Sequence, residues 1–133
     1  MPELFSDDWA KNYKEIWNSS EGIADELGES NFNSVVAFGV DGEDLPRIVL
    51  TISNGQVVTA SRPNGELINW DLRATLDNWN ALVTKPPGLM KLGLAYTSRK
   101  LKFKKGDYAV MIKDPRLSTA FVKCFALMGR AIN

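Results

Sequence analysis

The sequence predicts an α+β fold in which a five-stranded, mainly antiparallel sheet is covered on one face by helices. Segments rich in strand-forming residues follow one another between residues 32 and 72, and turn residues separate them. Amphipathic helical patterns precede and follow these segments. The composition, 44% hydrophobic and 24% charged residues, is that of an ordinary globular protein. We expect residues 1–133 to form a single domain, because a chain of this length can bury a core of its own.

The first helix is expected over residues 7–18. Ser6 supplies a capping hydroxyl, and Asp7 and Asp8 place negative charge in the first turn, where the helix dipole favours it. One face of this helix carries the residues that we expect in the core: Trp9, Tyr13, Ile16 and Trp17. A short helical turn is expected over residues 21–27, just before Gly28.

Four strands are expected next, over residues 32–41, 47–53, 57–60 and 67–72. The pair Asn54-Gly55 tolerates the positive φ angles of a tight hairpin, so it is expected to join the second strand to the third. We expect the four strands to form an antiparallel meander, with one polar face and one face covered by helices.

The second half of the chain returns to helices and adds one more strand. Thr75 is expected to cap a helix that ends before Pro86-Pro87, and another helix is expected to begin near Gly88. A fifth strand is expected over residues 101–104, where apolar residues and lysines alternate. A short helical segment over residues 108–112 and a long amphipathic helix from about residue 116 to the end complete the chain, with Pro115 suited to a first helical turn.

This second half contains more apolar helix surface than a small domain needs to close its core. The final helix carries a broad apolar stripe: Leu117, Phe121, Cys124, Phe125, Met128, Ala131 and Ile132. A shorter segment is apolar on nearly every side: Leu89, Met90, Leu92, Leu94 and Tyr96. A helix that is apolar all round is either buried between other elements or wrapped around another apolar body. The excess therefore points to a bound lipid, although the same residues also suit an ordinary core.

Charge is divided unevenly along the chain. Residues 1–84 carry 14 acidic and 5 basic side chains, whereas residues 85–133 carry 2 and 11, so the net charges are −9 and +9. Part of the excess forms a basic strip on the expected fifth strand: Arg99, Lys100, Lys102, Lys104 and Lys105. The strip fits an edge strand that lysines protect from aggregation, or a surface with weak attraction to an anionic membrane or to a lipid head group.

Several classes of chemistry have no support in the sequence. The chain has no histidine, which removes the commonest general base and metal ligand. Glycine-rich phosphate loops and the twelve-residue calcium loop are absent. The outward, basic face of the fifth strand has no interleaved aromatic residues that could act as stacking platforms for bases. We therefore expect no enzyme activity, no metal, no cofactor and no nucleic acid partner.

The cellular compartment is predicted from the same composition. Cys124 is the only cysteine, which excludes an internal disulfide, and its place on the apolar stripe is typical of a small buried hydrophobe. A reducing compartment fits this best. Because neither an export signal nor an apolar spanning segment is recognisable, we expect a cytoplasmic protein.

Two segments carry a family resemblance that spans nearly the whole chain. The passage Thr75-Leu76-Asp77-Asn78-Trp79 and the run Lys-Leu-Lys-Phe-Lys-Lys-Gly-Asp at 100–107, together with the order of elements, resemble the sterol carrier protein 2 family. The resemblance implies a five-stranded sheet covered by helices on one face. It also implies a hydrophobic tunnel between the layers that takes fatty acids, acyl-CoA or sterols.

We therefore expect a non-catalytic lipid-binding or carrier protein that holds a fatty acid, a fatty acyl-CoA or a sterol-like lipid in an apolar cavity. The residues expected to line this cavity are Trp70, Trp79, Leu82, Leu89, Met90, Leu94, Phe103, Met111, Phe121, Cys124, Phe125 and Met128. Two alternatives stay open. One is an interaction or dimerisation module of the same fold with a filled core, which would form a homodimer. The other is an accessory subunit that presents an acyl substrate to an enzyme.

Overall fold

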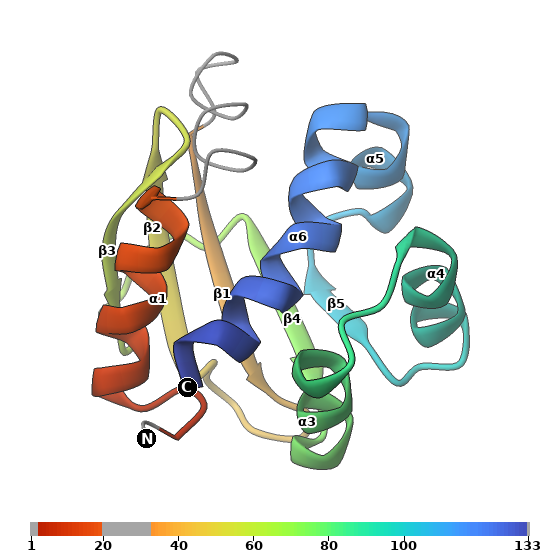
Figure 1. Ribbon diagram of the computed structural model, residues 1–133, viewed down its shortest axis with the longest axis horizontal. Helices are drawn as coiled ribbons and strands as arrows, with labels where there is room; N and C mark the ends of the chain where they lie inside the picture. Colours follow the sequence, from red (N-terminus) through yellow and green to blue (C-terminus); the bar gives the residue numbers. More distant parts are fainter. Residues whose placement is uncertain (1–2, 20–32, 133) are drawn as a thin grey trace.

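The computed structural model describes residues 3–19 and 33–132, which form one five-stranded sheet with helices against one face (Figure 1). The elements in chain order are α1 (Asp7–Ser19), β1 (Ser34–Val40), β2 (Ile48–Ser53), β3 (Gln56–Ser61), β4 (Trp70–Ala74), α3 (Leu76–Thr84), α4 (Leu89–Thr97), β5 (Lys102–Lys105), α5 (Tyr108–Lys113) and α6 (Pro115–Ile132). The helical turn expected over residues 21–27 lies outside the described residues. Within the described ranges, no helix is long and apolar enough to cross a membrane.

The strand order is β3-β2-β1-β4-β5, which differs from the expected meander. β2 pairs antiparallel with both β1 and β3, and β5 pairs antiparallel with β4. β4, however, lies parallel to β1, on the side of β1 away from β2. The sheet is therefore mixed, and the prediction that the fourth strand continues the antiparallel meander is wrong.

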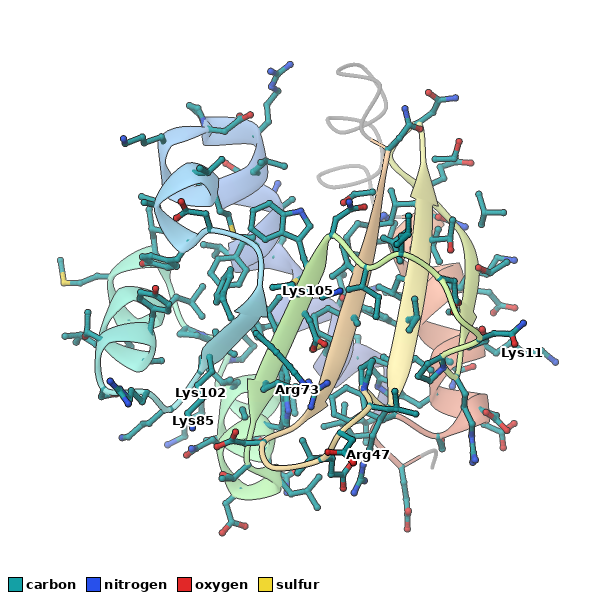
Figure 2. The ribbon with its side chains drawn as sticks, turned by 180° about the vertical axis from the view of Figure 1, so that it is seen from behind. Lys11, Arg47, Arg73, Lys85, Lys102 and Lys105 are labelled. Atoms are coloured by element: carbon teal, nitrogen blue, oxygen red, sulfur yellow. The ribbon has the colours of Figure 1, made fainter. Side chains whose placement is uncertain are left out.

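The connection between β3 and β4 explains this difference. Residues 62–69 cross the face of the sheet that the helices leave open (Figure 2). At the end of the connection, the backbone N–H of Asn69 donates to the carbonyl oxygen of Val35 (2.9 Å). The side-chain oxygen of Asn69 accepts from the N–H of Val35 (2.8 Å). These two bonds place the next residue, Trp70, opposite Val36 and so align β4 with β1.

The core lies between the sheet and the helices, where α1 and α6 pack side by side. Among the described residues, the largest fully buried side chains are mostly aromatic or branched: Trp9, Trp79, Tyr13, Phe38, Phe125, Ile48, Leu50, Leu72, Leu92 and Leu101. Three side chains of α1 also donate to backbone carbonyl oxygens of α6: Trp9 to Met128 (3.1 Å), Asn12 to Ala131 (3.3 Å) and Tyr13 to Cys124 (3.2 Å). These bonds satisfy polar groups that burial would otherwise leave unpaired, and they attach the second half of α6 to α1.

Local signals in the sequence are confirmed where the chain turns. Asn54 and Gly55 have φ angles of 51° and 79°, as the tight hairpin between β2 and β3 requires. The Thr75 hydroxyl accepts from the N–H of Asn78 (3.1 Å) and so caps α3. One turn into α3, the indole N–H of Trp79 donates to the carbonyl oxygen of Gly39 (2.8 Å), which attaches this helix to β1.

The open face of the sheet carries a buried ion pair that no sequence pattern predicts. Arg73 binds both carboxylate oxygens of Asp71, at 2.7 and 3.0 Å, and both side chains are only 4% exposed. The same guanidinium donates to the carbonyl oxygen of Glu43 (2.6 Å), in the loop between β1 and β2. A bidentate pair with a further acceptor is one of the few arrangements in which burial of two charges is tolerated. The pair therefore fastens this loop over the open face.

Candidate functional site

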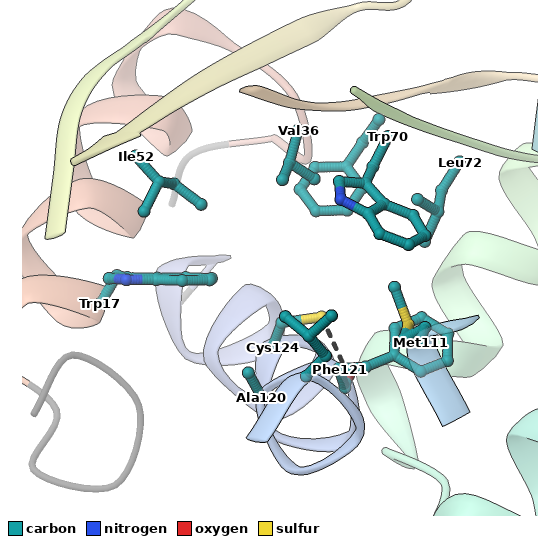
Figure 3. Close-up of a pocket in the computed structure, with 11 residues that line it drawn as sticks. Trp17, Val36, Ile52, Trp70, Leu72, Met111, Ala120, Phe121 and Cys124 are labelled. Carbon is teal, nitrogen blue, oxygen red and sulfur yellow. Dashed lines mark hydrogen bonds between the residues drawn. The ribbon is translucent and has the colours of Figure 1, made fainter. Parts of the chain in front are cut away.

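An apolar cavity of about 60 Å³ lies between the sheet and the first half of α6 (Figure 3). Its walls come from α1, from the three strands β1, β2 and β4, and from the helices α5 and α6. The described residues that line it are Trp17, Val36, Phe38, Ile52, Trp70, Leu72, Met111, Leu117, Ala120, Phe121 and Cys124. All of these side chains are apolar or only weakly polar.

The sheet wall of the cavity follows from strand alternation and register. Side chains two residues apart point to the same face of a strand, so Val36 and Phe38 of β1 both face the helices. The parallel pairing sets Val36 opposite Trp70 and Phe38 opposite Leu72. The Trp70 ring is held from behind by Gly106, where a Cβ would collide with the indole. This wall is therefore fixed by the same β1–β4 pairing that departs from the meander.

The helix wall leaves the space because it carries small side chains. Ala120 and Cys124 are one turn apart on α6 and both face the sheet, while Phe121 closes one side. Met111 of α5 and Leu117 add flexible apolar groups at the end nearer the start of α6. A helix with larger residues at 120 and 124 would fill this volume. The two small residues are thus the local cause of the cavity.

The walls present no unpaired polar group to the cavity. The Trp17 indole N–H donates to the carbonyl oxygen of Gly55 (2.8 Å), and the Cys124 thiol donates to the carbonyl oxygen of Phe121 (3.0 Å). Among the described residues, no buried side-chain nitrogen or oxygen lacks a hydrogen-bond partner. Burial raises the pKa of the Cys124 thiol, which keeps it protonated and unreactive at neutral pH. The lining therefore offers water no hydrogen-bond partner among these side-chain groups.

The structure brings only some of the predicted site residues to this cavity. Trp70, Met111, Phe121 and Cys124 line it. Trp79, Leu82, Phe125 and Met128 are buried beside it but belong to the packed core. Phe125 illustrates the difference, because its ring meets Trp79 at 6.2 Å and Phe121 at 5.3 Å between ring centres. The second half of the apolar stripe on α6 is therefore core rather than cavity wall.

Phe103 lies in an aromatic cluster that connects the cavity wall with α4. Its ring centre is 6.2 Å from that of Trp70 and 5.7 Å from that of Phe121. On its other side it meets Tyr96 (5.6 Å) and Tyr108 (5.7 Å), which stack on each other at 4.1 Å. Phe103 is therefore one layer behind the cavity rather than in its wall.

The structure does not place Leu89, Met90 and Leu94 in the cavity. All three are exposed on α4, and Met90 is 83% exposed. The expectation was that a segment apolar on every side is buried or wrapped around an apolar body. The expectation of burial is wrong for these three residues, because α4 lies beyond β5 at the edge of the sheet and turns only one side, with Leu92, to the core (Figure 1). Their contact with a bound apolar body stays a prediction.

Lys102, Lys104 and Lys105 of the basic strip lie on the edge strand β5, as expected, and Arg99 and Lys100 lie in the turn before it. Lys102 pairs with Asp41 (2.7 Å), and the Lys104 ammonium donates to the carbonyl oxygen of Asp44 (3.2 Å). Hydrogen bonding to Lys102 lowers the pKa of Asp41. Both contacts join the basic second half of the chain to the acidic first half, so part of the charge asymmetry is neutralised within the molecule.

Sequence reasoning missed seven residues of the cavity wall: Trp17, Val36, Phe38, Ile52, Leu72, Leu117 and Ala120. All of them except Ala120 were expected in the strands, the first helix or the apolar stripe, but not at a ligand site. Alternate strand positions facing the helices would have suggested the strand residues. The small residue Ala120, one turn before Cys124, was the available signal for a gap in the helix layer.

The cavity is small compared with known ligand sites. Pockets that hold drug-sized ligands measure roughly 300–1,000 Å³. The space between the described residues is partly open and measures about 60 Å³, which is room for a few water-sized groups. A long acyl chain would therefore have to displace part of the wall. The apolar tunnel that the family resemblance implied stays a prediction.

Comparison of the sequence with known families gives no match. No protein-family model matches the chain, and no curated protein matches it.

Comparison of the structures does find relatives of the fold. A crystal structure of sterol carrier protein 2 has a TM-score of 0.74 and 22% identity, covering 96% of this chain and 98% of that chain. The solution structure of a conserved hypothetical protein of Thermus thermophilus, suggested to be a sterol carrier protein, has a TM-score of 0.69 and 23% identity over 97% of this chain and 90% of that chain. The ubiquinone synthesis protein UbiJ-SCP2 has a TM-score of 0.60 and 16% identity over 99% of this chain and 96% of that chain.

At these identities the likeness establishes the fold. Each match covers nearly the whole of both chains, so the sheet and its helical layer are shared as a unit rather than in part. The chain has an α+β fold of the sterol carrier protein 2 type, as the sequence resemblance implied.

Proposed function

We propose that this chain, which has the fold of sterol carrier protein 2, is a non-catalytic lipid-binding protein. Its ligand would be a fatty acid, a fatty acyl-CoA or a sterol-like lipid, with the apolar part between the sheet and α6. The observation that carries the proposal is the cavity itself, because its wall is apolar and its few polar groups are already hydrogen-bonded. Such a wall gains free energy from apolar area that leaves water, at roughly 25 cal/mol per Å².

The way α6 is attached supports a cavity that expands. The three side-chain bonds from α1 reach α6 at Cys124, Met128 and Ala131. The residues of α6 that line the cavity, from Leu117 to Cys124, lie at or before the first of these attachments. The first half of α6 can therefore move away from the sheet while the second half keeps its bonds. A ligand too large for the resting cavity would enter by this movement.

A second candidate function is that of an accessory subunit that presents an apolar substrate to an enzyme. It is favoured by the likeness to the ubiquinone synthesis protein UbiJ-SCP2. Both candidates need the cavity, so ligand binding does not separate them. Size-exclusion chromatography of a native cell extract separates the two candidates, because a carrier elutes at the mass of the single chain and an accessory subunit elutes in a larger assembly.

The first test is native mass spectrometry of the purified protein, followed by organic extraction of whatever it carries. A fluorescent long-chain fatty acid is then titrated against the wild type and against Ala120→Phe, which places a ring in the cavity. Ala126→Phe makes the same change on α6 at a half-buried position outside the cavity and is the matched control. We expect Ala120→Phe to weaken binding at least about tenfold and the control to change it less than about twofold.

Two results would contradict the proposal. If a folded Ala120→Phe variant binds the fatty acid as tightly as the wild type, the ligand does not occupy this cavity. If the wild type carries no lipid and binds neither the fatty acid nor its acyl-CoA, the chain is better explained as an interaction module. Circular dichroism and a thermal unfolding curve of each variant establish that it is folded.

A further inference from the structure

We propose that α4 docks the protein on an anionic lipid bilayer. The docking surface, called here the α4 face, consists of the exposed apolar residues Leu89, Met90 and Leu94 and the cations Lys85, Lys91, Arg99 and Lys100 around them. The inference concerns the outer surface of the molecule, so it does not depend on what occupies the cavity.

The apolar part of the α4 face is unusually exposed. Met90 is 83%, Leu94 64% and Leu89 43% exposed. Met90 and Leu94 are one helical turn apart, so their side chains adjoin on the surface. Leu92, on the opposite side of the helix, is fully buried and attaches α4 to the core. The helix is therefore held by one side and presents large apolar side chains to solvent on the other.

The segment of sequence around these residues carries charge of one sign. Residues 78–106 contain seven lysines and arginines and no aspartate or glutamate. The side chains of Lys85, Lys91, Arg99 and Lys100 are exposed, and none of them forms an ion pair with the described residues. Lys85 projects at the same edge of the molecule as Lys102 (Figure 2), but Lys102 is paired with Asp41 and is not counted in the α4 face. The α4 face thus combines unneutralised positive charge with apolar side chains.

This combination is the one that an anionic membrane surface recognises. Lysines and arginines near such a surface are attracted by its negative potential, at roughly 1 kcal/mol each, and apolar side chains among them enter the region of the acyl chains. Of the other strongly exposed apolar residues, Leu45, Val58 and Leu67 are scattered in the acidic half of the chain, and Val110 lies on α5. Those residues fit ordinary surface exposure, whereas the α4 face is a patch with matching charge.

An aromatic cluster connects α4 with the cavity wall. Tyr96 of α4 stacks on Tyr108 and meets Phe103, and Phe103 meets Phe121 in the cavity wall. The rings of Tyr96, Tyr108 and Phe103 therefore lie between α4 and the cavity wall. A protein docked by this face would hold its apolar cavity close to the membrane, where an apolar molecule can pass without crossing water.

The experiment measures binding of the full chain to sedimented vesicles of phosphatidylcholine alone and of phosphatidylcholine with about 30% phosphatidylserine. The test variant is Met90→Glu with Leu94→Glu. The matched control, Val58→Glu with Leu67→Glu, makes the same change in net charge at exposed apolar positions far from α4 in the sequence. We expect the wild type and the control to bind the anionic vesicles, with less binding at high salt, and the test variant to bind at least about tenfold more weakly.

The outcomes separate this proposal from the proposed function. If the wild type binds the fluorescent fatty acid but does not bind anionic vesicles, membrane docking is overturned and the carrier function still stands. An equal loss of vesicle binding in the test variant and the control would overturn the assignment to α4. A third outcome is a wild type that does not bind vesicles but self-associates. If Met90→Glu with Leu94→Glu abolishes this self-association, the α4 face is instead a contact between two copies.

Discussion

The two halves of α6 pack against the same sheet and differ in how completely they fill the space. In the second half, Phe125, Met128 and Ala131 have no exposed surface, and α1 donates hydrogen bonds to three of its carbonyl oxygens. The helix also passes so close to α3 that a Cβ at Gly129 would collide with the carbonyl oxygen of Val83. In the first half, Leu117, Ala120 and Phe121 border a cavity instead.

The difference teaches how one helix can serve both stability and binding. A close-packed half with satisfied polar groups fixes the position of the helix and resists any change in volume. A half with small side chains and fewer attachments opens at lower cost, because less packing is lost when it moves. The expected ligand site therefore lies where the packing is weakest, beside a region that keeps the fold in place.

The largest expected effect comes from deleting one ring in each half of α6. Phe125→Ala should lower the free energy of unfolding by about 3–5 kcal/mol, because it leaves a cavity in a filled region. Phe121→Ala should cost less, because Phe121 already borders empty space on one side. Urea unfolding of both variants measures this difference. Equal costs would mean that the two halves are packed alike.

A smaller effect is expected from adding volume to each half. Gly129→Ala adds one carbon against the Val83 carbonyl and should lower the free energy of unfolding by about 1–3 kcal/mol. Ala120→Phe adds a whole ring to the cavity and should change the free energy of unfolding by less than about 1.5 kcal/mol. Thermal unfolding curves of the two variants at one pH compare these two costs. If the single carbon proves cheaper than the ring, the cavity is not available space.

The smallest effect depends on pH and concerns the residues where the halves of α6 meet. Burial raises the pKa values of the Cys124 thiol and of the Tyr13 hydroxyl in the folded state. An unfolded thiol loses its proton above about pH 8.5 and the folded thiol keeps it, so the free energy of unfolding should fall by up to about 1.4 kcal/mol per pH unit above that value.

The comparison variant is Cys124→Ala, in which this loss should begin only near pH 10, where an unfolded tyrosine ionises. Urea midpoints of both proteins at pH 7, 9 and 10, set with about equal ionic strength, measure the effect. If the two proteins lose stability in parallel from pH 8.5 upwards, the Cys124 thiol is not buried as the structure places it. Below about pH 8 the thiol keeps its proton in the folded and the unfolded protein, so its ionisation should not change the free energy of unfolding there.

Much of the fold could be predicted because its signals are local. The capping hydroxyl of Thr75 and the pair Asn54-Gly55 act on the backbone within three residues, so a short stretch of sequence is enough to read them. The alternation of lysines and apolar residues also identified β5 as an edge strand. These features together determined the elements, their order along the chain and the division into a sheet and a helical layer.

The candidate site could be predicted only in part, because a cavity is a property of several elements together. Phe121 and Phe125 lie on the same apolar stripe of α6, yet one lines the cavity and the other fills the core. Periodicity records which face of a helix turns inward and does not record what lies opposite each residue. The exposure of Leu94 was likewise invisible, since it follows from the place of α4 beyond the edge of the sheet.

The sequence by itself thus determined the elements and the α+β class, since caps, turns and periodicities depend on neighbouring residues. The tertiary structure alone decided that β4 lies parallel to β1, that Asp71 and Arg73 form a buried pair, and that the first half of α6 leaves a gap over the sheet. Each of these features depends on groups far apart in the chain. Asn69 is hydrogen-bonded to Val35, and Ala120 lines the cavity opposite Trp70. Contacts of this kind are settled by packing and by the pairing of buried polar groups, which no local pattern contains.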